Sequence, residues 1–224
     1  MKTTEELFLE LLMVSIGKMD CLSRGPEPEE WGRLYELSKR HQVEGITYQG
    51  VVKLFEYGLR APQEVSLEWM SEAEMIKETN EQAPQVVSSE RYYPADLKNW
   101  RRADDDGLQD VERVTIEHVY GLYRHNRLTM RALMDYHYTL LNTSRSLEPI
   151  KCKGLFFELF KAVGIRRFAR GIMWLLQQSF GLERTFMLCE PFEQEGSYLF
   201  ASLTQSLSFR QRLWHRLLYG YSSN

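Results

Sequence analysis

The chain has 224 residues, 43% of them hydrophobic and 12% aromatic, and a formal net charge of −3. This length and apolar content exclude a disordered chain and allow one large or two small hydrophobic cores. Residues 1–107 carry 21 acidic and 13 basic side chains, whereas residues 108–224 carry 10 acidic and 15 basic ones. A nucleic-acid-binding domain is usually far more basic than this. The opposite charges of the two halves favour their docking against each other. The small excess of basic residues in the second half argues against a nucleic-acid partner.

The three cysteines, Cys21, Cys152 and Cys189, are odd in number and form no CxxC pair. The sequence therefore predicts reduced core thiols, and neither a disulfide framework nor a zinc site. Glutamates interrupt the apolar run at the N-terminus, so it does not match a signal peptide, and no stretch of about 20 apolar residues could span a bilayer. We therefore expect a cytoplasmic protein without a transmembrane segment.

Four helices are predicted near the N-terminus, over residues 4–16, 28–41, 45–57 and 63–82. The first begins at a capping box, in which the side chain of Thr3 accepts from the amide of Glu6 and the side chain of Glu6 accepts from the amide of Thr3. The second has Pro28 and glutamates in its first turn, where the helix dipole favours acid, and it ends in basic residues. His41 at that end is expected to act as a capping cation and not as a catalyst. Together the four helices predict a compact antiparallel bundle over residues 1–82.

Residues 83–107 break the helical pattern with prolines, serines and adjacent valines, and they predict an irregular linker. Asp104 and Asp106 lie in a DDDG run at its end, and Asp110 follows one turn later. Mg²⁺ prefers one or two carboxylate ligands together with the phosphate oxygens of a substrate, so one interpretation of these aspartates is a magnesium site. The lack of any strand pattern around them favours instead a solvated loop that caps the next helix.

Two helices, over residues 108–126 and 129–141, are predicted to form a hairpin that holds three of the five histidines. His118 and His125 are seven residues apart, so they share a helix face but lie about 10 Å from each other along the axis, too far to bind one metal ion. A metal site would need the i, i+4 spacing instead. We therefore expect these rings to hydrogen-bond inside the bundle.

The second helix of this hairpin carries Asp135 and His137, which are two residues apart and therefore point to different sides. Arg131 lies at i−4 from Asp135, within reach of its carboxylate. We expect these two charges to pair, which makes the hairpin a structural polar element. Its members are His118, His125, Arg131 and Asp135.

Further helices are predicted over residues 155–162, 166–180 and 193–206, and a last one ends near residue 219. Gly164 and Gly181 lie at the expected C-terminal stops. Residues 168–180 are apolar almost all round and belong in a core. The last helix is basic and amphipathic, and packing on the protein body is favoured over attachment to a membrane surface. The predicted fold is thus all-α, with two antiparallel bundles (1–82 and 108–224) joined by the irregular linker (83–107).

Two stretches resemble a large bacterial family of nucleotidyltransferase-like proteins that is related to polymerase-beta-type enzymes. Residues 5–82, with EEWGRLYELSKRHQVEGITYQGV and LEWMSEAEMIKETNEQ, are similar to the family's helical N-terminal region. Residues 111–206, with HVYGLYRHNRLTMRALMDYHYTLL and GIRRFARGIMWLLQQSFGL, are similar to its helical C-terminal region. Between these regions the family has a catalytic domain with a glycine-aspartate-x-aspartate motif on a strand. Here the pair Asp104 and Asp106 lacks both the preceding glycine and the strand pattern.

The resemblance implies a shortened nucleotidyltransferase-like protein without catalytic activity. Such a protein acts as a binding or interaction protein for a protein partner or a nucleoside triphosphate. The alternative is an active Mg-dependent nucleotidyltransferase that uses Asp104 and Asp106 as catalytic residues and, with Asp110, as metal ligands. In that alternative the phosphates are held by Arg101, Arg102 or Arg124.

Overall fold

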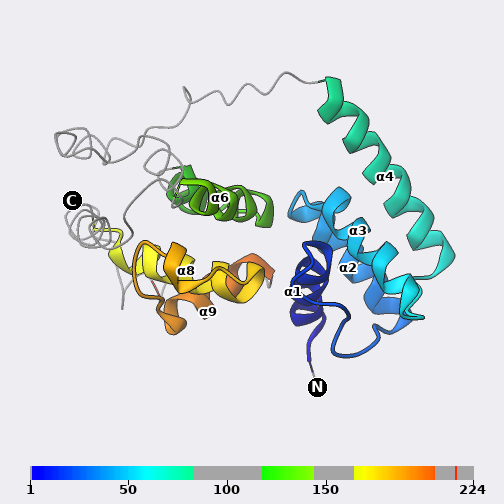
Figure 1. Cartoon of the computed structure of the whole chain (residues 1–224), viewed down its shortest axis with the longest axis horizontal. Helices are drawn as coiled ribbons and strands as arrows, with labels where there is room; N and C mark the ends of the chain where they lie inside the picture. The colour runs from blue at the N-terminus through cyan, green and yellow to red at the C-terminus, as the bar shows by residue number, and fades with distance from the viewer. Residues whose placement is uncertain (1, 83–117, 144–163, 205–214, 216–224) are drawn as a thin grey trace. The chain divides into compact units, whose positions relative to one another are not determined.

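The computed structural model describes residues 2–82, 118–143, 164–204 and 215 (Figure 1). All regular secondary structure in these ranges is helical and they contain no strand, which confirms the predicted all-α class. The elements are α1 (Thr4–Ser15), α2 (Pro28–Arg40), α3 (Glu44–Glu56), α4 (Gln63–Gln82), α6 (Met130–Thr143), α8 (Arg166–Phe180), the 3₁₀-helix η2 (Arg184–Phe186) and α9 (Glu193–Thr204). Among them, none combines the length and the apolarity needed to cross a bilayer.

The chain divides into two compact units, of which the first contains α1 to α4 and the second contains α9 and most of α6 and α8. The predicted linker, residues 83–107, lies outside the described residues. The boundaries of the linker and the antiparallel arrangement within each bundle therefore stay predictions.

The helices of the first unit begin and end where local signals place them. At α1 the Thr3 hydroxyl accepts from the Glu6 amide (3.3 Å) and the Glu6 carboxylate accepts from the Thr3 amide (2.8 Å), which confirms the predicted capping box. Gly17 follows α1 with a φ of 75°, in the left-handed region that glycine adopts without strain. Pro28 is the first residue of α2, where its missing amide hydrogen costs no hydrogen bond.

The core of the first unit forms where α1 and α4 each pack against both α2 and α3. Five apolar side chains of α1 are fully buried: Leu7, Phe8, Leu11, Leu12 and Val14. Trp69 of α4 is fully buried as well, and its indole nitrogen donates to the carbonyl of Glu44 at 3.2 Å. His41 occupies the predicted C-cap of α2, but its ring is buried and stacks on Phe8 with centroids 5.6 Å apart.

In the second unit, α8 spans residues 166–180 as predicted and supplies much of the described core. Seven of its apolar side chains are fully buried: Phe168, Ala169, Ile172, Met173, Leu175, Leu176 and Phe180. Gly181 follows α8 with a φ of 64°, which confirms it as a helix stop. Gly164 has a φ of 72°, as expected for a stop, but the helix predicted before it lies outside the described residues. α9 is described up to Thr204, and the predicted boundary at 206 lies outside the described residues. The helix predicted over 155–162 lies outside the described residues, as does most of the last one.

Candidate functional site

The acidic residues of the possible metal site lie outside the part of the chain that the structure describes. They are Asp104, Asp106 and Asp110, with the neighbouring Arg101 and Arg102. Their roles as catalytic residues, metal ligands or helix caps stay predictions. Within the described ranges, no three His, Cys, Asp or Glu residues are grouped so that they could hold a metal ion.

The histidines at positions 118 and 125 require a correction. Residues 118–124 are helical, and the chain turns at Asn126, whose φ of 53° confirms the predicted stop there. His118 and His125 are both exposed. The prediction that their rings lie inside the bundle is therefore wrong, while the hydrogen bonds of these rings stay a prediction. They do share a face, but the buried residues are Val119 and Tyr120, so the packed side of the helix is turned away from the histidine side.

On α6, Asp135 is exposed and His137 is buried, which confirms that these two side chains point to different sides. Arg131 is exposed, as is Arg124 at the end of the preceding helical segment. The pairing of Arg131 with Asp135 stays a prediction. An exposed pair of this kind would contribute less than about 1 kcal/mol to stability.

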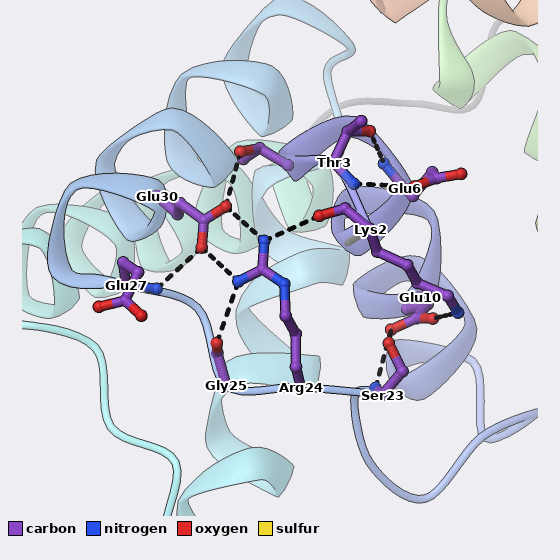
Figure 2. Close-up of polar contacts among 10 residues, drawn as sticks. Lys2, Thr3, Glu6, Glu10, Ser23, Arg24, Gly25, Glu27 and Glu30 are labelled. Carbon is purple, nitrogen blue, oxygen red and sulfur yellow. Dashed lines mark hydrogen bonds and ion pairs between the residues drawn. The ribbon is translucent and has the colours of Figure 1, made fainter.

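A polar cluster joins the start of α1 to the loop before α2 (Figure 2). The Arg24 guanidinium donates to both oxygens of the Glu30 carboxylate at 2.6 Å and to the carbonyl of Lys2 at 3.0 Å. Thr4 donates to the same carboxylate at 2.9 Å. The bonds from Arg24, followed by the bond from the amide of Glu27, lower the pKa of Glu30 to about 2. Glu30 is therefore an anion at neutral pH and is unsuited to proton transfer there.

A second carboxylate, Glu10, is buried against the same loop (Figure 2). It accepts from the amide and the hydroxyl of Ser23, both at 2.9 Å, and it pairs with Lys2. Burial by itself raises the pKa of Glu10, but the bonds from Lys2 and Ser23 outweigh it and leave the pKa below its ordinary value. Because both carboxylates are used internally, we interpret the cluster as a structural clasp between α1 and α2. The α1–α2 clasp consists of Lys2, Thr4, Glu10, Ser23, Arg24 and Glu30.

Glu195 of α9 is a fully buried carboxylate in the second unit. It accepts from the Arg167 guanidinium of α8, and the same oxygen lies 3.1 Å from Nε2 of His215. The His215 ring stacks on Tyr198, with ring centroids 3.4 Å apart. A buried charge is tolerated only when it is paired, so this cluster ties α8 to α9 and is interpreted as structural. The signal for this cluster in the sequence is the position of Glu195. It lies one helical turn before Leu199, so a charged residue shares the face of the helix that carries apolar residues.

The two described cysteines differ in exposure. Cys21 is half-buried and Cys189 is buried, and both are free thiols. The predicted core position holds for Cys189 and not for Cys21. Cys152 lies outside the described residues, and the reduced state of the thiols stays a prediction. Burial raises the pKa of Cys189 to about 12, so its thiol is not poised to act as a nucleophile.

An apolar groove runs between α3 and α4 in the first unit and has a volume of about 420 Å³. Its walls are formed by residues of both helices and of the connecting loop: Tyr48, Val51, Val52, Phe55, Leu59, Arg60, Ala61, Gln63, Ser66 and Leu67. Three of the large apolar side chains are markedly exposed, with Val52 at 48%, Phe55 at 57% and Leu67 at 52%. An open apolar groove of this kind is typical of a binding surface.

Helical spacing explains why this surface is continuous. Tyr48, Val52 and Phe55 lie at i, i+4 and i+7 on α3, so they form one stripe along the helix. Leu54, which the sequence could not distinguish from Phe55, is fully buried on the core side. The sequence placed both in one helix, but it did not reveal which apolar residues stay open to solvent.

Comparison of the chain with models of protein families, with curated proteins and with solved structures finds no match. The resemblance to nucleotidyltransferase-like proteins therefore stays a prediction. Within the part of the chain that the structure describes, the α3–α4 groove is the feature that most directly suggests a function, because it exposes apolar side chains to solvent.

Proposed function

We propose that this chain is an interaction protein, a shortened nucleotidyltransferase-like protein without catalytic activity, which binds an apolar segment of a partner protein in the α3–α4 groove. The observation that carries the proposal is the joint exposure of Val52, Phe55 and Leu67 along one groove. Apolar surface left open to water is unfavourable, and a partner that covers it removes that cost. The proposed location is the cytoplasm, in keeping with the free thiols of Cys21 and Cys189.

The expected affinity follows from the exposed area. Complete burial of a large apolar side chain gives about 1.5–3 kcal/mol, and side chains that start half exposed gain about half of that. Covering Val52, Phe55 and Leu67 therefore contributes roughly 2–5 kcal/mol. Association itself costs about 4 kcal/mol or more in lost translational and rotational freedom. The partner must supply apolar side chains and polar contacts of its own, and we expect a dissociation constant in about the micromolar range.

Peptide selection on the full-length protein tests the proposal. A random peptide library displayed on phage is enriched on the wild-type chain, and the enriched peptides are then measured singly against two variants. Leu67→Gln replaces an apolar side chain in the groove, whereas Met75→Gln replaces a side chain on the same helix that is 65% exposed and outside the groove. Peptides that bind wild type and Met75→Gln equally, and Leu67→Gln at least about tenfold more weakly, would support the proposal. Equal binding to all three proteins would refute it.

The absence of catalytic activity is tested separately. The full-length chain is titrated calorimetrically with ATP, CTP, GTP or UTP and Mg²⁺ and is assayed for transfer, and no nucleotidyl group should be transferred to any acceptor. Micromolar binding together with such transfer would refute this part of the proposal. Transfer that disappears in the double variant Asp104→Ala, Asp106→Ala would establish the enzymatic alternative instead. The peptide experiment is independent of this result, since the two use different parts of the chain.

A further inference from the structure

The α3–α4 groove has an acidic rim. Residues 44–82 contain eight glutamates and only three basic residues. Glu56, Glu64 and Glu68 are exposed, and each directly follows a residue that lines the groove. Successive residues of a helix are about 100° apart, so these carboxylates lie beside the groove lining and not on its floor.

Two of the basic residues in this stretch, Lys53 and Arg60, make contacts that bear on how far they neutralise the glutamates. Lys53 donates to the carbonyl oxygens of Val14 and Ser15, at 3.0 and 3.2 Å, and so completes the C-terminal end of α1. The guanidinium of Arg60 lies 4.5 Å from the centre of the Phe55 ring, where it covers part of the groove lining. Arg60 thus places one positive charge at the groove against the three exposed glutamates Glu56, Glu64 and Glu68. The net charge of the rim is therefore negative, and it complements a basic partner.

The groove also selects the conformation of its partner. The stripe of Tyr48, Val52 and Phe55 runs along α3 with helical spacing, and Leu67 of α4 faces the same groove. An amphipathic helix presents a matching stripe at i, i+3 or i+4, and i+7. An extended segment would instead need a sheet edge for its backbone hydrogen bonds, and the described residues contain no strand.

We infer that the segment bound in the α3–α4 groove is a basic amphipathic helix of a partner protein. This inference rests on the proposed function and adds the charge and the conformation of the partner. The glutamates that attract a basic helix would repel an anionic membrane surface. They would also repel the same groove on a second copy of the chain.

Two synthetic peptides of about 18 residues test the inference, because a shorter helix would be marginal even when bound. Both carry leucines at i, i+3, i+4 and i+7, and they differ only in having lysine or glutamate at the flanking positions. Fluorescence anisotropy is measured with the full-length protein at about 50 mM and about 500 mM salt. We expect the lysine peptide to bind at least about tenfold more tightly at low salt, with most of this advantage lost at high salt. Its difference circular dichroism should show added helix on binding.

Charge variants locate the effect on the rim. Glu56→Gln, Glu64→Gln and Glu68→Gln should each weaken the lysine peptide by about two- to fivefold, as expected for an exposed ion pair. Glu36→Gln is the matched control, because Glu36 is exposed on α2 and does not line the groove. Anionic phospholipid vesicles, used as a third probe, should not bind the protein.

The outcomes separate the inference from the proposed function. If both peptides bind with equal affinity and Leu67→Gln weakens both, the groove binds apolar segments without regard to charge and the inference is overturned. Binding of the anionic vesicles in preference to the lysine peptide would also overturn it. If neither peptide binds, or if Leu67→Gln has no effect on either, the proposed function itself fails.

Discussion

Gly50 marks a close approach of α1 and α3, and replacing it should destabilise the first unit. A Cβ atom added at this position would lie 2.4 Å from the Ser15 hydroxyl oxygen, 2.9 Å from Cδ1 of Leu11 and 3.0 Å from the Leu11 carbonyl oxygen. All three distances are far shorter than an ordinary van der Waals contact. The variant Gly50→Ala therefore requires atoms of α1 to move.

The magnitude follows from two opposing effects. Alanine is more favourable than glycine inside a helix by about 0.8–1.0 kcal/mol. Overpacking typically costs about 1–3 kcal/mol. Ser15 cannot rotate away without losing the bond of 2.7 Å that it donates to the Leu11 carbonyl, and that carbonyl moves only with the backbone of α1. We therefore take the upper part of the overpacking range and expect a net loss of about 1–2 kcal/mol in the free energy of unfolding.

Urea unfolding followed by circular dichroism measures this loss. The matched control is Gly32→Ala on α2, where an added Cβ atom would have no neighbour within 4 Å. The control should gain about 0.5–1 kcal/mol from helix propensity alone, so the two variants should differ in sign. A Gly50→Ala protein that is as stable as the wild type would show that α1 and α3 do not pack as closely as the structure indicates.

Three further predictions concern buried and paired groups. Arg167→Met should lower the free energy of unfolding by about 3 kcal/mol and Glu195→Gln by only about 1–2 kcal/mol. The reason is that Arg167→Met leaves the fully buried Glu195 without its guanidinium partner, whereas Glu195→Gln leaves Arg167, which is 28% exposed, in reach of water. Equal losses in urea unfolding would contradict this pairing. The pKa of Glu30 lies at about 2, below its ordinary value of 4.5, so its contribution to stability is complete above pH 4.5 and is lost as the pH falls towards 2. Arg24→Gln should raise this pKa in an NMR titration, and an unchanged value would show that Arg24 is not the main cause. Iodoacetamide at about pH 8 should modify Cys21 well before Cys189, because burial raises the pKa of Cys189 to about 12; mass spectrometry of the digested protein would reveal the opposite order if it occurred.

Most boundaries of the described helices could be predicted, because each depends on residues only a few positions apart. The capping box of Thr3 and Glu6, Pro28 at the first turn of α2, and Gly181 after α8 are all local signals, and all three were confirmed. The second capping box, between Glu27 and Glu30, was not predicted. Its sequence signal was weaker, since glutamate is not among the residues that usually cap a helix.

The polar clusters could not be predicted in the same way, since each joins residues that are distant in the sequence. Glu10 bonds to Ser23 across the loop between α1 and α2, and Glu195 binds Arg167 from another helix. A sequence shows that such charges exist, but their partners depend on how the helices pack. Between residues 118 and 138 the sequence predicted histidine rings inside the bundle, whereas His118 and His125 are exposed and His137 is buried.

By itself, the sequence determined that this protein is all-α and where most of its described helices begin and end. The tertiary structure decided which side of each helix faces the core. On α3 it buried Leu54 and left Phe55 open in the α3–α4 groove, although both residues are large and apolar. The physical reason is one of range: hydrogen bonds at helix ends form within a single turn, whereas burial is set by the neighbouring helices.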